Sequence, residues 1–143
     1  MANGVRDLKV WQEATLLAGE VLRIMRQSAR RETKTFTDQT IEGAAAIAAA
    51  ISEGYVLSAP NEHRRALTDA RRQLVTLEAR LTIAKHGGLI SAQAHAQLAA
   101  RLALTTRLLS GYLGFIDRQI RPDSAVTPEI ADAVSSVVGL AGE

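Results

Sequence analysis

The amino-acid sequence predicts an all-α protein, namely an antiparallel up-down four-helix bundle with a short C-terminal tail or helix. Apolar residues recur at helical spacing in four long stretches, and no stretch shows the alternation of a strand. The links between the stretches are short, which makes neighbouring helices antiparallel. Of the 143 residues, 47% are hydrophobic and only 3% are aromatic. The core is therefore expected to consist mainly of leucine, isoleucine, valine and alanine.

The first helix is predicted to begin near Leu8, with Asp7 as its N-cap. Its apolar residues follow helical spacing and are Leu8, Trp11, Ala14, Ala18, Val21, Leu22 and Met25. The pattern fades in a polar run, residues 27–37, which contains neither proline nor glycine. The end of this helix is therefore left open by the sequence.

The second helix is predicted to start at Thr35 or Thr37, since either residue is able to cap it. Its apolar face consists of Ile41, Ala44, Ala48, Ile51 and Tyr55. Residues 44–51 are all alanine or isoleucine, a run well short of the ~20 residues that span a membrane. Alanine is the best helix former, and its small side chain lets neighbouring helices approach closely. Replacing Ala48 by leucine is expected to overpack this helix at a cost of about 1–3 kcal/mol.

Proline and glycine mark the limits of the last two helices. A break at residues 58–61 precedes the third helix, with Pro60 in its first turn, and Gly87-Gly88 ends it through a left-handed cap. Its apolar positions are Leu67, Ala70, Leu74, Leu77, Leu81 and Ala84. The fourth helix is capped by Ser91 and stopped by Pro122. Its apolar positions are Leu98, Leu102, Thr105, Leu109, Tyr112, Leu113, Ile116 and Ile120.

The bundle is predicted to be one domain, residues 1–121, followed by a C-terminal tail, residues 122–143. Within the tail, Thr127-Pro128-Glu129 is expected to start one short helix, residues 130–140, that docks on the bundle or stays mobile. This segment has an apolar side but no basic residue, so attraction to anionic lipid is missing. We therefore expect it to dock on the bundle or on a neighbouring subunit, and we expect no membrane binding.

The composition and the N-terminus exclude some classes of site and of protein. The chain contains no cysteine, which excludes disulfides and thiolate zinc sites and fits a cytoplasmic protein. Its N-terminus, MANGVRDLKVW, lacks the apolar segment of a secretory signal. The 17 Lys and Arg against 15 Asp and Glu give a formal net charge of +2, which by itself identifies no partner.

Several stretches resemble the family of 23S rRNA intervening-sequence proteins, also called four helix bundle proteins. Residues 7–14, DLKVWQEA, resemble the signature of the family's first helix. The family's second helix carries the pattern Q-x-x-R-A-x-x-S-I-x-x-N-I-A-E-G, and the matching residues here are Gln39, Ile47, Ile51, Glu53 and Gly54. A third-helix pattern, E-x-x-L-x-I-A followed by glycine, is matched by Glu78, Leu81, Ile83, Ala84 and Gly87. The resemblance covers residues 5–119.

The chain departs from this pattern at polar positions of the family. The arginine, serine and asparagine of the second helix are Glu42, Ala46 and Ala50 here, and a Gly-Ser pair of the third helix is Arg72-Gln73. The resemblance implies ring-shaped homo-oligomers, typically pentamers. It also points to the accessory proteins of diversity-generating retroelements, which associate with a reverse transcriptase and bind nucleic acid. It implies no enzymatic activity and no cofactor.

Arginines supply the candidate phosphate contacts, because the guanidinium fork matches phosphate oxygens. The candidates, grouped by helix, are Arg23, Arg26 and Arg30, then Arg64, Arg65, Arg71 and Arg72, and finally Arg107 and Arg118. In the third helix these arginines lie away from the apolar side, and the alternative interpretation is a solvated face balanced by nearby carboxylates. In a ring, each patch would be repeated around the axis.

Five further residues are predicted to be structural or interface positions: Trp11, Gln39, Ala48, Glu53 and Gly54. Glu53 is expected to form an ion pair with an arginine or to cap a helix, and Gly54 to permit close packing or a bend. No metal site is predicted, since the histidines do not pair at ligand spacing; they are His63, His86 and His95. With so few aromatic residues, recognition of single strands by base stacking is not favoured.

Two functions remain in competition. The first is a non-enzymatic homo-oligomeric adaptor, a pentameric ring, that binds RNA or DNA and serves a reverse transcriptase. The second is a structural or protein-interaction four-helix bundle with no nucleic-acid role. An enzyme is the least supported class, because the sequence shows no catalytic cluster and no Glu-x-x-His pattern of a di-metal bundle.

Overall fold

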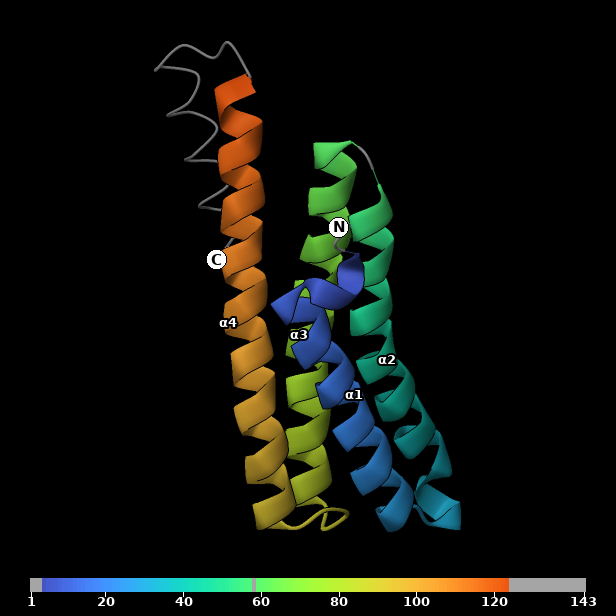
Figure 1. Ribbon diagram of the computed structural model, residues 1–143. Helices are drawn as coiled ribbons and strands as arrows, with labels where there is room; N and C mark the ends of the chain where they lie inside the picture. Colours follow the sequence, from blue (N-terminus) through green and yellow to red (C-terminus); the bar gives the residue numbers. More distant parts are fainter. Residues whose placement is uncertain (1–3, 58, 124–143) are drawn as a thin grey trace.

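The computed structural model describes residues 4–57 and 59–123 and consists of long helices that lie side by side (Figure 1). Its elements are η1 (Val5–Asp7), α1 (Lys9–Ser28), η2 (Arg31–Thr33), α2 (Lys34–Val56), α3 (Pro60–His86) and α4 (Ala92–Asp123), where η denotes a 3-10 helix. The predicted all-α four-helix bundle is confirmed. The predicted helix at residues 130–140 lies outside the described residues, and the domain boundary at residue 121 stays a prediction.

The helices run alternately up and down. Both α1 and α3 pack against α2 and α4, so α1 and α3 occupy diagonal corners of the bundle. The α1–α2 and α3–α4 links lie at the lower end in Figure 1, and the α2–α3 link lies at the upper end. Because α1 has 20 residues and α4 has 32, α4 continues upward well beyond the first turn of α1 (Figure 1).

One cluster of aliphatic side chains from all four helices forms the core. The six apolar positions predicted for α3 are all buried. In α1 the prediction was wrong at Leu22, which is 44% exposed, and it missed Leu17, which is fully buried. The two positions were confused because α1 faces two neighbours, α2 and α4, and the sequence does not show where the buried stripe ends on either side.

The helix starts differ from prediction, whereas the glycine and proline signals hold. Asp7 does not cap α1, because it belongs to η1 and Leu8 takes the N-cap position. The start of α2 is Lys34, and the predicted cap residue Thr37 is buried inside the helix. The start of α3 has Pro60 in its first turn, and Gly88 takes the left-handed conformation with φ 79°.

The fourth helix also follows its predicted cap closely. The Ser91 hydroxyl accepts a hydrogen bond from the Ala94 backbone N–H at 3.0 Å. The helix ends at Asp123, one residue after the predicted stop at Pro122.

Small residues in α2 allow its neighbours to approach closely. A Cβ at Gly54 would lie 3.0 Å from the Ala66 Cβ and 3.2 Å from the His63 Cδ2 of α3, which agrees with the close-packing interpretation of this glycine. A Cβ at Gly43 would lie 2.9 Å from the Arg80 Nη1. In the alanine run, Ala44 is fully buried while Ala48 is only partly buried, so leucine is expected to be tolerated less well at Ala44 than at Ala48.

Candidate nucleic-acid interface

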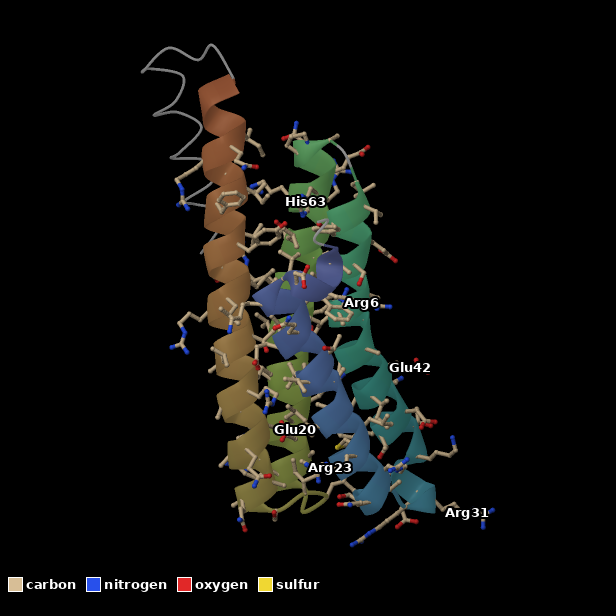
Figure 2. The ribbon with its side chains drawn as sticks, in the orientation of Figure 1. Arg6, Glu20, Arg23, Arg31, Glu42 and His63 are labelled. Atoms are coloured by element: carbon tan, nitrogen blue, oxygen red, sulfur yellow. The ribbon has the colours of Figure 1, made fainter. Side chains whose placement is uncertain are left out.

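The nine predicted arginines form three groups, one in α1 and the link after it, one in α3 and one in α4. The first surface, here called the α1-end patch, consists of Arg23, Arg26 and Arg30, which are all exposed. Figure 2 shows Arg23 and Arg31 near the end of the bundle where α1 leads into α2. Arg23 lies 3.9 Å from the Glu20 carboxylate, a weak contact, and Arg26 and Arg30 form no ion pair among the described residues.

The second surface, the α3 patch, consists of Arg64, Arg65, Arg71 and Arg72. Two of its arginines are held by carboxylates of this chain. The Arg64 Nε donates to the Asp117 Oδ1 of α4 at 2.5 Å, and Arg72 donates to Asp69 one turn earlier in α3. The hydrogen bond from Arg72 holds the pKa of the Asp69 carboxyl below its usual value.

The α3 patch surrounds a hollow of about 460 Å³, lined by Asn61, Arg64, Arg65, Thr68, Asp69 and Arg72. The Thr68 Oγ1 is buried and, within the described part of the chain, has no hydrogen-bond partner. The hollow thus combines three guanidinium groups and an amide with the Asp69 carboxylate. Because Arg64 and Arg72 are paired with Asp117 and Asp69, Arg65 is the arginine of this lining that has no carboxylate partner among the described residues.

The third surface, the α4 patch, consists of Arg107 and Arg118, both exposed. The Arg118 side chain lies along its own helix, with its Nη1 3.6 Å from the point where a Cβ at Gly114 would be. Neither arginine has a carboxylate partner in residues 4–57 or 59–120. Their charges are therefore available to a partner in solution.

Most of the predicted phosphate contacts thus have no acidic partner. Six of the nine form no ion pair with a described residue, and they are Arg26, Arg30, Arg65, Arg71, Arg107 and Arg118. Residues 4–120 contain 16 Lys and Arg against 11 Asp and Glu, so this part of the chain carries a formal charge of +5, against +2 for the whole sequence. The basic excess of the protein is concentrated in its bundle.

The predicted structural residues have different environments. The Trp11 Nε1 donates to the Ser52 Oγ at 2.8 Å and joins α1 to α2. Gln39 contributes its backbone carbonyl, which accepts a hydrogen bond from the Arg80 Nη1 at 3.1 Å. The ion pair expected for Glu53 is absent from the described residues, because this side chain projects from α2 into solvent.

An interhelical clamp at Arg101 was not predicted. Its Nη1 donates to the Glu13 Oε1 at 2.8 Å and its Nε to the Glu20 Oε1 at 2.9 Å, so that α4 is tied to α1. The hydrogen bond to Glu20, followed by the charges of both carboxylates, raises the pKa of Arg101. The spacing of Glu13 and Glu20, seven residues or two turns apart, was the sequence signal that could have identified this clamp.

The sequence also did not predict an aromatic cluster at the end of the bundle where α2 leads into α3. The rings of Tyr112 and Phe115 are stacked, with centroids 6.2 Å apart, and Tyr112 meets His63 edge to face at 5.5 Å. The Tyr112 hydroxyl lies 3.4 Å from the His63 Nε2. Burial, followed by the charge of Tyr55, raises the pKa of the Tyr112 phenol. Because His63 and Tyr112 are 49 residues apart, no local pattern could have joined them.

His63 is expected to make the stability of the bundle depend on pH. Burial lowers the pKa of His63 below 6.5, so between the folded and unfolded pKa values the unfolded chain binds more protons. The stability contributed by neutral His63 is therefore complete above pH 6.5 and is lost as the pH falls below it. Urea unfolding between pH 7.5 and pH 5 should show a steeper loss for the wild type than for His63→Gln.

His86→Gln, at an exposed histidine of the same helix, is the matched control for this experiment. Parallel curves for the wild type and His63→Gln would contradict the prediction.

Other classes of site receive no support from the described residues. In residues 4–57 and 59–123, no group of three or more histidine, aspartate or glutamate side chains is arranged to hold a metal ion. Of the helices that the structure describes, none has the length and apolarity needed to cross a membrane.

Comparison with known proteins gives one family. Residues 6–111 match the model of the 23S rRNA-intervening sequence protein family, and comparison with curated proteins found no significant match. The matched segment is more than half of the chain, and it includes eight of the nine predicted arginines, all except Arg118. It also includes α1, α2 and α3 in full. The chain therefore belongs to the family of 23S rRNA-intervening sequence proteins.

Proposed function

We propose that this protein is a non-enzymatic, homo-oligomeric basic adaptor that binds RNA or DNA through its exposed arginines. The observation that carries this proposal is the set of six predicted arginines that have no carboxylate partner among the described residues. An arginine without an internal partner keeps its charge available for phosphate, so that contact with nucleic acid releases counterions. The family description, which refers to 23S rRNA, is compatible with such a small helical adaptor.

A ring of copies would strengthen weak contacts. Each basic surface of one copy is small, but in a ring it recurs around the axis, and binding at several copies at once raises the overall affinity through effective concentration. The resemblance described above implies a pentamer as the ring and a reverse transcriptase of a diversity-generating retroelement as a protein partner. Both belong to the proposal.

The outer faces of two diagonal helices offer surfaces for such a ring. Leu16 of α1 is 52% exposed, and Val75 and Ile83 of α3 are 65% and 57% exposed. A head-to-tail ring needs two different surfaces on each copy, and α1 and α3 supply apolar surfaces at opposite corners of the bundle. In α3 these residues follow the arginines along the helix, so a ring closed in this way would leave the α3 patch beside each subunit contact.

The alternative function is a structural or protein-interaction bundle with no role on nucleic acid. The observation that favours it is the internal pairing of Arg64 with Asp117 and of Arg72 with Asp69. In that case the arginines would serve packing and solubility. Binding measured against salt separates the two functions.

Binding to nucleic acid is expected to weaken steeply with salt. In a plot of log affinity against log salt concentration, each phosphate contact should add a slope of about −0.9 on duplex DNA and about −0.7 on a single strand. The quadruple variant Arg26→Gln, Arg30→Gln, Arg65→Gln, Arg107→Gln should reduce both the affinity and the slope. Fluorescence anisotropy with labelled oligonucleotides measures both.

The matched control neutralises the internally paired arginines, Arg64→Gln with Arg72→Gln. These variants should change the slope less for each arginine removed, because their carboxylate partners already neutralise the charges. A slope near zero for the wild type, with a monodisperse protein in light scattering, would reject nucleic-acid binding in favour of the alternative function.

A further inference from the structure

We propose that Phe115, supported by Tyr112, is a stacking platform for an unpaired base of single-stranded nucleic acid. This inference rests on the proposed nucleic-acid function and assigns it a preferred substrate class, namely single strands or unpaired loops. It departs from the expectation based on the low aromatic content of the sequence, because the structure brings two of the few aromatic rings together. Three observations support it: the position of Phe115 in the bundle, the stacking of its ring on Tyr112, and the guanidinium groups on the same side of α4.

Phe115 lies on a part of α4 that α1 does not cover. The clamp from Arg101 to Glu13 fixes the relative height of the two helices. At 1.5 Å per residue, Phe115 is about 21 Å beyond Arg101, whereas α1 begins only about 6 Å beyond Glu13. The upper part of α4 therefore extends past α1, as Figure 1 shows, and Phe115 is 45% exposed there.

The ring of Phe115 is supported from inside the bundle. It stacks on Tyr112 with an angle of 10° between the ring planes. Tyr112 is itself half-buried and contacts His63 of α3 both edge to face and through its hydroxyl. A ring that is already held in place loses little conformational freedom when a base stacks on it, which favours binding.

The position one turn before Phe115 on α4 carries no side chain. It is Gly111, four residues earlier, on the part of the helix surface that adjoins Phe115. A Cβ at Gly111 would meet no atom within 4 Å. The described residues therefore leave open space at this position, where a flat base has room.

Two guanidinium groups flank the platform on the same outer side of α4. Arg118 is one turn beyond Phe115, about 4.5 Å along the axis, and Arg107 is about 12 Å before it. Both are exposed and have no carboxylate partner among the described residues. An exposed aromatic ring between backbone-binding cations is the arrangement by which proteins hold single strands.

The same geometry disfavours the other occupants of an exposed aromatic ring. Bases in a duplex are already stacked on each other and do not present their faces to a side chain, so this site selects unpaired bases. A second copy of the chain would have to place an apolar surface against two positive charges, Arg107 and Arg118, that have no carboxylate partner among the described residues. We therefore assign the ring to a base and not to a subunit contact.

The test compares four variants of the full chain on two ligands, a labelled single-stranded oligouridine and a labelled duplex of the same length. Phe115→Ala should weaken single-strand binding about 5- to 150-fold and change duplex binding less than about twofold. Phe115→Tyr should keep the affinity, since the stacking face remains. Gly111→Leu should weaken single-strand binding by filling the open space at this position, while Gly111→Ala should not.

The outcomes separate this inference from the proposed function. If the wild type binds with a steep salt slope but Phe115→Ala binds the single strand as tightly, the platform is overturned and the basic adaptor stands. If the wild type binds neither ligand, both proposals fail. Equal losses on the two ligands, or a lower oligomer mass of Phe115→Ala in light scattering, would assign Phe115 to a structural or subunit contact and overturn the platform.

Discussion

Replacing Leu17 by alanine is expected to lower the free energy of unfolding by about 2–5 kcal/mol. Leu17 in α1 is fully buried in the core between the helices. Truncation removes apolar contacts and leaves a cavity that the surrounding helices fill only in part, and both effects destabilise the bundle. A loss of this size is a large fraction of the total stability of a small domain.

A second leucine of α1 supplies a matched control. Leu22 is the same residue type in the same helix but is 44% exposed, so Leu22→Ala should change stability by less than about 0.5 kcal/mol. Urea unfolding of both variants at two protein concentrations gives the comparison. Similar losses at both positions, independent of protein concentration, would show that α1 does not bury the stripe described above.

Replacing Gly54 by leucine is the second large effect, with an expected loss of about 1–3 kcal/mol. A Cβ at this position already lies 3.0 Å from the Ala66 Cβ and 3.2 Å from the His63 Cδ2, and the rest of a leucine side chain would force α2 and α3 apart. The loss should occur although leucine forms helix better than glycine by almost 1 kcal/mol. Thermal unfolding followed by circular dichroism measures it.

Two variants test the cause. Gly19→Leu in α1, where a Cβ would meet nothing within 4 Å, should gain stability from helix propensity. In a double-mutant cycle, Ala66→Gly should recover part of the loss in Gly54→Leu, because it removes the nearest atom. If Gly54→Leu is as stable as Gly19→Leu, the α2–α3 contact is not as close as the structure describes.

The Gly54 variant also bears on the stacking platform. His63 is one of the two residues that a side chain at position 54 would meet, and His63 supports Tyr112. A displaced His63 should loosen Tyr112 and with it the ring of Phe115. Gly54→Leu is therefore expected to weaken single-strand binding more than duplex binding, without any change on the surface of α4.

Features of the fold that depend on local chemistry were predictable. The apolar stripe of α3 was predicted in full, because its aliphatic residues recur without a break at alternating spacings of three and four and the helix is bounded by Pro60 and Gly87-Gly88. The cap at Ser91 was predicted for the same reason, since its acceptor lies three residues from the donor.

The starts of α1 and α2 were not predicted. Asp7, which was expected to cap α1, belongs to the short 3-10 turn before that helix. Thr35 and Thr37, which were expected to cap α2, lie inside that helix, because it begins at Lys34, directly after a second 3-10 turn.

The candidate interface also has features that local sequence predicts and features that only helix packing decides. The sequence located every exposed arginine of the three patches, because charge and helical spacing are local properties. It could not distinguish Arg64, whose partner Asp117 lies 53 residues away, from Arg65 next to it, which has no acidic partner among the described residues. Helix packing decides which of two adjacent arginines keeps its charge free.

By itself, the sequence determined the fold class, the family and the positions of the basic residues, since these depend on periodicity, composition and motifs within single helices. Only the tertiary structure decided which arginines are neutralised, that Arg101 ties α4 to α1, and that three aromatic or imidazole rings meet at one end of the bundle. The physical reason is that ion pairs and ring contacts form over a few ångströms between residues distant in the chain. Their formation depends on the relative height and rotation of the helices, which no local pattern specifies.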